Sequence, residues 1–187
     1  MIVALFVVCG VVLLLFIWVV VVYNRFVAVR QHLKESWSDV DVELKRRYDL
    51  IPNLINTVKG YAAHEKSLFE AVTLARTKAM DNTGRPDRQS GDEQVLAHQV
   101  KKLMAVAENY PQLKADANFR ALQDELVNTE DRIAASRRFY NGNVRELNRL
   151  CREFPSSILA GIFGFKEQGF FELDDDSERS VPEVSTT

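Results

Sequence analysis

Side chains that could do chemistry are few in this 187-residue chain, and they are scattered along it. His64 and Glu65 come nearest to a catalytic pair, but neighbouring residues on a helix point about 100° apart. A zinc-binding helix would carry a second histidine four residues further on, and His32 and His98 lie in other segments. The chain has no Gly-rich phosphate loop and no G-x-S-x-G motif. The sequence therefore predicts no catalytic residue, no metal site and no cofactor.

A second group of polar residues surrounds a proline. Arg46, Arg47, Asp49, Pro52 and Asn53 lie within eight positions of the sequence. Arg46 and Asp49 are three residues apart, so they can form a surface ion pair that stabilises a helix by tenths of a kcal/mol, on the order of 0.2–0.5. Alternatively, Asp49 and Asn53 hold backbone groups that Pro52 frees, or grip a partner helix. We favour the structural role, because residues beside a helix proline compensate for lost backbone bonds.

The cysteines and the charge balance exclude several classes of protein. Cys9 and Cys151 cannot make a disulfide framework, and Cys151 is expected to act as a small apolar residue. The net charge is −2, which results from a charge-free stretch 1–24, a slightly basic stretch 25–165 at +3 and an acidic stretch 166–187 at −5. None of these segments is basic enough for a nucleic-acid binder.

The first stretch predicts a transmembrane helix. Residues 2–23 form an uninterrupted apolar run whose helical length is roughly 33 Å, enough to cross a bilayer core, and Tyr23 is placed as an interfacial anchor. A cleaved signal peptide would need a basic start and an A-x-A-like site, and neither is present. Arg25, Arg30 and Lys34 follow the run. The positive-inside rule therefore predicts a single-pass protein with its N-terminus outside and its body in the cytoplasm.

The body is predicted to be all-α, because apolar residues recur every three or four positions and Gly and Pro are sparse. One stripe runs from Trp37 to Ala62, and its phase continues through Pro52, so we expect one long, kinked helix from about residue 25 to 80. A second helix is expected to begin with a Ser90–Glu93 capping box and to end before Pro111. A third carries a coiled-coil-like apolar seam over residues 119–154.

A short helix is expected to close the bundle after Pro155, capped by Ser156 or Ser157. Its apolar residues suit a core, an oligomer contact or a membrane-surface helix, and with Lys166 as the only base, lipid binding has little electrostatic help. The candidate oligomer contacts are Ile158, Ile162, Phe163 and Phe165.

Helix lengths leave two topologies open. Either the third helix extends beyond the others and packs on another subunit, or the chain turns near Asp49–Pro52 to make a four-helix up-and-down bundle. The domains are expected to be a transmembrane anchor at 1–24, a helical bundle at 25–165 and a mostly disordered acidic tail at 166–187.

An ordered series of motifs makes the chain similar to one protein family. The motifs are Arg46-Arg47-Tyr48-Asp49-Leu50-Ile51-Pro52-Asn53-Leu54, Asn56 to Ala62, His64-Glu65, Glu108 to Ala115, Leu122 to Leu126, Thr129 to Ile133, Tyr140-Asn141, Val144, Phe154-Pro155, Ile158 to Ala160, Phe163-Gly164-Phe165 and Phe170-Phe171-Glu172. The chain resembles the LemA proteins over nearly its whole length from the apolar run to Glu172. Gly142, in the third helix, departs slightly from the family pattern.

This resemblance implies a bacterial inner-membrane protein with an N-terminal anchor and a cytoplasmic four-helix, bromodomain-like bundle. The family has no established catalytic residues. It is associated with membrane stress and with neighbouring membrane proteases and TPM-domain proteins, and a related branch takes part in magnetosome formation.

The residues and the resemblance together favour a non-enzymatic membrane-anchored scaffold or adaptor. We expect it to self-associate and to present its bundle to membrane-protein partners, in envelope stress or protease regulation. The alternatives are a membrane-shaping protein, as in the magnetosome-related branch, and a hydrolase or cell-envelope enzyme with its site between the helices.

Overall fold

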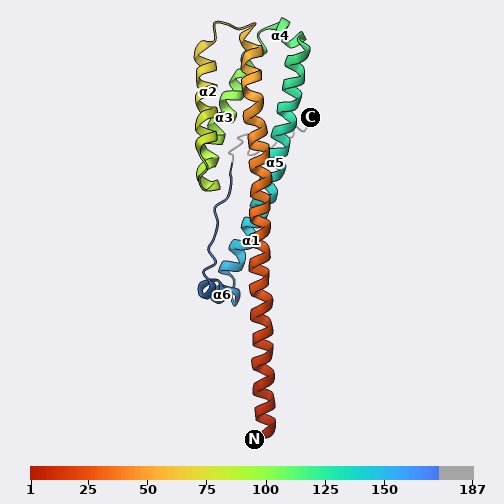
Figure 1. Cartoon of the computed structure of the whole chain (residues 1–187), viewed down its shortest axis with the longest axis vertical. Helices are drawn as coiled ribbons and strands as arrows, with labels where there is room; N and C mark the ends of the chain where they lie inside the picture. Colours follow the sequence, from red (N-terminus) through yellow and green to blue (C-terminus); the bar gives the residue numbers. More distant parts are fainter. Residues whose placement is uncertain (173–187) are drawn as a thin grey trace, which may run out of the picture. The chain divides into compact units, whose positions relative to one another are not determined.

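The computed structural model describes residues 1–172, and every regular element in that range is an α-helix. The helices are α1 (Ile2–Lys59), α2 (Lys66–Asp81), α3 (Pro86–Ala107), α4 (Pro111–Ala115), α5 (Ala117–Arg152) and α6 (Ser156–Phe163) (Figure 1). The predicted all-α class is therefore confirmed. The acidic end from Leu173 onward, predicted to be disordered, lies outside the described residues.

α1 begins as the predicted apolar run and continues through Pro52. Its first part is long and apolar enough to cross a membrane, and none of that stretch is buried. The predicted continuity at Pro52 is confirmed, and the alternative turn near Asp49–Pro52 is wrong. The helix ends at Lys59, however, rather than near residue 80, because the chain turns at Gly60 while the backbone N–H groups of Tyr61 and Ala62 bond to the carbonyl of Val58.

α2 and α3 form an antiparallel hairpin with extensive mutual contact (Figure 1). Asn82 shapes the turn between them, because its side chain accepts a bond from the N–H of Gly84 and donates to Asp92 at 2.6 Å. α3 begins at Pro86, whose missing N–H suits a first helical position. The predicted capping box at Ser90 is therefore wrong, since Ser90 lies inside the helix and its hydroxyl donates to the carbonyl of Asp87.

α5 carries the predicted seam and passes through Gly142 without a break. Asp116 caps it, because Asp116 Oδ1 accepts the backbone N–H of Phe119 at 2.9 Å. Phe154, the last predicted seam residue, lies beyond the end of α5 and is 82% exposed, so its assignment to the seam is wrong.

α6 follows Pro155 and ends at Gly164, whose φ of 71° is a left-handed conformation that favours glycine. Neither predicted serine cap forms. The hydroxyl of Ser156 instead donates to the carbonyls of Leu150 and Glu153, at 2.8 and 2.9 Å, which ties the start of α6 to the end of α5.

The chain folds as two compact units, and α1 and α5 each contribute to both. The first unit consists of Met1–Val42 and Ile133–Phe170. Within it α1 and α5 run antiparallel, since Arg25 pairs with Glu146 and Trp37 packs on Tyr140. Asn143 of the seam donates to the hydroxyl of Ser36 across these helices.

The second unit contains Glu43–Arg132 and therefore segments of α1 and α5 together with α2, α3 and α4. Its core contains buried apolar side chains from each of the four longer segments. These include Leu44, Ile51, Val72, Leu96, Leu103 and Phe119. Four helical segments thus share one core in this unit, as in a four-helix bundle.

Candidate functional site

Charged residues are buried in the core of the second unit. Arg47 of α1 is 0% exposed, and its guanidinium donates to Glu93 of α3 and to both carboxylate oxygens of Glu130 of α5, at 3.1 and 3.2 Å. The hydroxyl of Tyr48 donates to the other oxygen of Glu93. We call Arg47, Tyr48, Glu93 and Glu130 the Arg47 cluster. It links three helices through charge-assisted hydrogen bonds.

Helix periodicity positions these side chains. Arg47 lies three residues after Leu44 and four before Ile51, so it shares their buried stripe. Glu93 lies three residues before Leu96 on the buried stripe of α3. The two opposite charges therefore project into the same core from different helices.

The surroundings of the Arg47 cluster fix its protonation. Burial alone would lower the pKa of Arg47, but the nearby carboxylates of Glu130 and Glu93 outweigh that effect and raise it. Burial and the hydrogen bond to Glu93 raise the pKa of Tyr48, so its hydroxyl stays a proton donor. Glu93 is 0% exposed, whereas the side chain of Glu130 remains 39% exposed. Gln89 of α3 also donates to Glu93, at 3.4 Å, whereas the buried Nε of Arg47 has no hydrogen-bond partner among the described residues.

The loss of a helical hydrogen bond at Pro52 is compensated by an arginine from another helix. Pro52 has no N–H, so the carbonyl of Tyr48, four residues earlier, loses its usual helical donor. Arg76 of α2 replaces that donor, because its Nε bonds to the Tyr48 carbonyl at 2.7 Å. The role that we expected of Asp49 and Asn53 is therefore performed by Arg76 at this carbonyl.

The predicted polar group around Pro52 divides in two. Arg47 points into the core, whereas Arg46, Asp49, Pro52 and Asn53 are exposed. Arg46 lies 3.6 Å from Glu43, whose side chain is 15% exposed. The four exposed residues remain candidates for a partner contact, and Arg47 belongs to the core.

Aromatic rings gather in the first unit where the apolar run ends. Tyr23 meets Phe163 edge-on at 4.9 Å between ring centroids and Phe165 at 5.9 Å. Phe165 also stacks on Phe26 at 4.5 Å, and the guanidinium carbon of Arg30 lies 5.8 Å from the centroid of its ring. These contacts fix α6 and the residues after it against α1.

The four predicted oligomer-contact residues differ in exposure. Ile158, Ile162 and Phe163 are 52%, 69% and 48% exposed, whereas Phe165 is partly covered by the rings described above. Leu159 and Ala160, on the other side of α6, are buried. α6 is therefore apolar on both its inner and its outer face.

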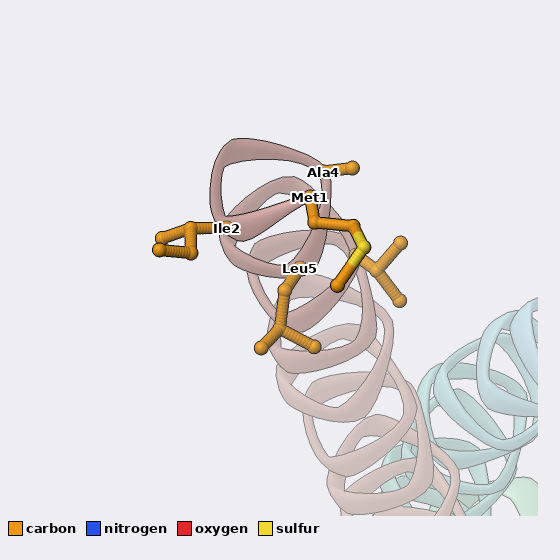
Figure 2. A pocket seen from close by; sticks show the side chains of 5 residues that line it. Met1, Ile2, Ala4 and Leu5 are labelled. Atoms are coloured by element: carbon orange, nitrogen blue, oxygen red, sulfur yellow. The ribbon is translucent and has the colours of Figure 1, made fainter.

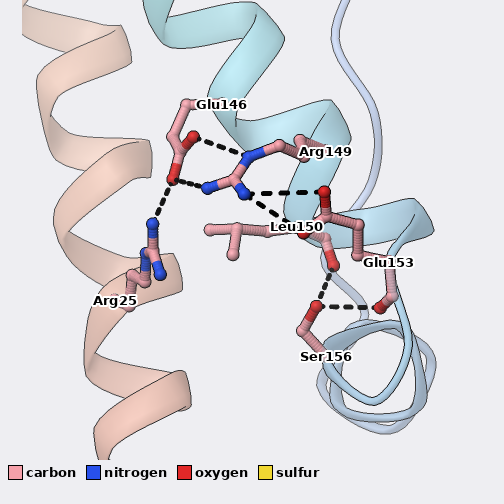
Figure 3. Close-up of polar contacts among 6 residues, drawn as sticks. All are labelled: Arg25, Glu146, Arg149, Leu150, Glu153 and Ser156. Atoms are coloured by element: carbon pink, nitrogen blue, oxygen red, sulfur yellow. Dashed lines mark hydrogen bonds and ion pairs between the residues drawn. The ribbon is translucent and has the colours of Figure 1, made fainter.

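A surface network of charges borders this region (Figure 3). Glu146 accepts bonds from Arg149 at 2.8 and 3.0 Å and from Arg25 at 2.7 Å, and Arg149 also pairs with Glu153. Arg149, and to a lesser degree Arg25, lowers the pKa of Glu146 below its ordinary value. The carboxylate of Glu146 therefore joins α5 to α1 directly beyond the apolar run.

A small hollow opens at the N-terminal tip of α1, lined by Met1, Ile2, Ala4, Leu5 and Val8. Figure 2 shows these side chains spread around one helix end, without polar atoms that converge on a ligand. We read it as the lipid-facing surface of the anchor and not as a binding site.

Outside the Arg47 cluster and the charges around Glu146, we looked for titratable side chains that could form a metal or catalytic site. Among residues 1–172, no three His, Cys, Asp or Glu side chains lie together as metal ligands. His64 is exposed in the turn after α1, and Asp49 is exposed on α1. Burial, and then the charge of Glu167, raise the pKa of Cys151, which disfavours the reactive thiolate.

Sequence reasoning missed Glu93 and Glu130 as partners of Arg47. A signal for Glu93 was present, because it lies three residues before Leu96 on an apolar stripe, where a buried charge needs a partner. Asp116 as the cap of α5 was also missed, although Asp is a preferred residue at that position.

Comparison with known proteins shows similarity to one family and to a group of related proteins. The model of the LemA family matches residues 36–185. Two relatives from Paramagnetospirillum magneticum, Magnetosome protein MamQ 1 and MamQ 2, are each 28% identical over 175 residues. Magnetosome protein MamQ from Magnetospirillum gryphiswaldense is 26% identical over 174 residues. Each match covers 80% of this chain, which spans 64% of the relative's length.

Proposed function

The chain belongs to the LemA family, and on that premise we propose that it is a non-enzymatic, membrane-anchored helical scaffold. It self-associates and presents its helical bundle to membrane-protein partners, in envelope stress or protease regulation. Membrane proteases and TPM-domain proteins are the partner classes that we would test first.

The Arg47 cluster carries the non-enzymatic part of this proposal. An enzyme of this fold would use buried polar groups to activate a substrate. Here Arg47 and Glu93 are 0% exposed and bonded to one another, so substrate cannot reach them. Among residues 1–172, the exposed candidates Asp49 and His64 do not belong to any group of three or more His, Cys, Asp or Glu side chains that could hold a metal ion. The rigid core then serves to hold an outer surface in a fixed shape.

The apolar part of α1 carries the membrane part of the proposal. Its side chains are exposed and uncharged, and Arg25, Arg30 and Lys34 follow directly. We propose that α1 crosses a bacterial inner membrane once, with the N-terminus outside and the bundle in the cytoplasm. A reporter fused to the C-terminus should be active in its cytoplasmic form, and periplasmic activity would overturn this orientation.

Cross-linking in native membranes tests the scaffold role. Photoreactive residues at Asn53 of α1 and Leu74 of α2, both exposed in the second unit, should trap defined partners or a second copy on irradiation. The wild-type chain, irradiated in the same way, is the control. A strict monomer in mild detergent together with no cross-linked product in cells would refute the scaffold. Activity on a substrate panel that Asp49→Ala or His64→Ala abolishes, without loss of helicity, would show an enzyme instead.

Membrane shaping is a second candidate, which the relatives favour because they carry magnetosome names. It needs an element that inserts into one leaflet or a self-assembling coat. Reconstitution of the full chain into vesicles, followed by electron microscopy, should then show altered vesicle shape. Unchanged vesicles at high protein density would count against it.

A further inference from the structure

We infer that α6 lies in the lipid–water interface beside its own anchor, with Ile158, Ile162 and Phe163 inserted among the acyl chains. This inference rests on the membrane anchor of the proposed function. It does not depend on the scaffold role or on the orientation of the chain. All the residues that carry it belong to the first unit.

The level of α6 along α1 is the first argument. Tyr23 ends the apolar run, Arg25 is the first charged residue, and tyrosine is enriched at the boundary between hydrocarbon and headgroups. Phe163, the last residue of α6, lies 4.9 Å from Tyr23 between ring centroids. The end of α6 is therefore placed where α1 leaves the hydrocarbon.

The composition of α6 is the second argument. A helix on a protein surface in water carries polar residues on its outer face. α6 has the sequence SSILAGIF, with no charged residue, and its outer face carries Ile158, Ile162 and Phe163. Ile162 alone is 69% exposed. Such a face needs an apolar environment.

The outer face of α6 is continuous with the surface of the anchor, and this favours lipid over a second copy of the chain as its environment. The side chains of the apolar run are exposed from Ile2 to Ile17 and again at Val20, Val21 and Tyr23, and α6 contacts Tyr23. The outer face of α6 therefore extends a surface that the anchor already presents to acyl chains. A partner chain bound to α6 would have to displace lipid from the outer face of α6 and from the adjoining surface of the anchor.

The charges around α6 predict how it inserts. Arg25, Arg149 and Arg152 pair with Glu146, Glu153 and Glu167. Lys166 is the one basic residue of the sequence from Ser156 to Gln168, so apolar burial rather than charge holds α6 in place. Its depth should therefore depend little on anionic lipid, which separates it from a basic membrane-surface helix.

Spin-label accessibility in the full chain tests the inference. Nitroxide labels are attached to single cysteines, in a Cys9→Ala, Cys151→Ala background, at Ile162, at Val12 and at Phe139. Phe139 is the matched control, because it is a 60% exposed aromatic residue of α5 in the same unit. Its neighbour Tyr140 packs on Trp37, which is about 21 Å beyond Tyr23 along α1. A label at Ile158 replaces Ile162 if that variant loses helicity.

The chain is reconstituted into vesicles of phosphatidylcholine, with and without phosphatidylglycerol. Collisions with oxygen, which concentrates in lipid, should exceed collisions with a water-soluble nickel chelate at Val12 and Ile162, and the reverse should hold at Phe139. The Ile162 result should be the same in both lipids and at all protein densities.

Three outcomes would overturn the inference. A label at Ile162 that behaves like the one at Phe139 places α6 in water. A label shielded from both reagents, with spin–spin broadening that grows with protein density, assigns the face to a second copy. A label at Val12 in water would refute the anchor itself, so failure of the anchor is distinguishable from failure of α6.

Discussion

Replacing Arg47 by methionine tests whether the Arg47 cluster stabilises the second unit. Methionine keeps an apolar stem of similar reach but removes the guanidinium. Glu93, which is 0% exposed, then loses its ion-pair partner in the core. Glu130 is affected less, because its side chain is 39% exposed and water can solvate it.

The size of the effect follows from burial. Removing one partner of a buried ion pair costs about 3–5 kcal/mol, because the other charge stays desolvated. The bonds from Tyr48 and Gln89 to Glu93 remain, which favours the lower part of that range. A change of 1 kcal/mol moves the unfolding midpoint of a chain of this size by about 2–4 °C. We therefore expect the midpoint to fall by about 6–20 °C.

Thermal unfolding of the full chain in mild detergent, followed by circular dichroism at neutral pH, measures this effect. Arg46→Met is the matched control, because Arg46 is the neighbouring arginine, its side chain is 41% exposed and its Nη1 lies 3.6 Å from Glu43 Oε2, beyond hydrogen-bond distance. The double variant Arg47→Met, Glu93→Gln should regain much of the loss, since glutamine removes the unpaired charge and still accepts a bond from Tyr48. Equal midpoints for Arg47→Met and Arg46→Met, or strict additivity in the double variant, would refute the reasoning.

Three further variants test other contacts by the same melts. Asp116→Ala should lower the midpoint at neutral pH, because Phe119 loses its capping acceptor. That bond lowers the pKa of Asp116, so its contribution is present above about pH 4 and lost as pH falls through the lowered pKa; a gap from wild type that persists in acid would contradict this. Burial and Glu93 raise the pKa of Tyr48, so wild type should lose stability above about pH 10 more steeply than Tyr48→Phe, and parallel curves would exclude this role. Gly142→Ala should stabilise α5 by about 0.5–1 kcal/mol, because nothing lies within 4 Å of the added Cβ, and a lower midpoint would reveal a contact that glycine permits.

The elements that could be predicted from sequence are those set by local pattern. The stripe from Trp37 to Ala62 and the seam of α5 were found because each buries one helix face, and period 3.6 reports such a face directly. The continuation of α1 through Pro52 followed from the same phase. The fold class needed no further information.

Reliance on the apolar period is also why the end of α1 was predicted wrongly. The apolar phase continues past Lys59 to Ala62, which is 1% exposed, although the chain has already turned. Periodicity reports burial and not chain direction. Gly60 was the local signal for the turn, and it was outweighed by the stripe.

The Arg47 cluster was missed because two local rules competed at Glu93. Ser90 and Glu93 have capping-box spacing, but Glu93 also lies on the stripe of Leu96. A proline at position 86 begins the helix earlier, which leaves Glu93 in the interior, where it needs a cation. That cation comes from Arg47, 46 positions earlier in sequence, and only the tertiary fold pairs them.

Two departures from the usual pattern, with apolar residues inside and polar residues outside, explain this chain better than any single motif does. In the second unit Arg47 and Glu93 are buried, and the fold compensates internally, because the opposite charges pair. In the first unit Ile162 is 69% exposed and Phe163, which meets Tyr23 on one side, is still 48% exposed. These apolar side chains must then be removed from water by something outside the described chain. Tyr23, which contacts Phe163, marks the end of the apolar run and indicates that lipid does so. One departure therefore stabilises the second unit from within, and the other supports our inference that α6 of the first unit lies against lipid.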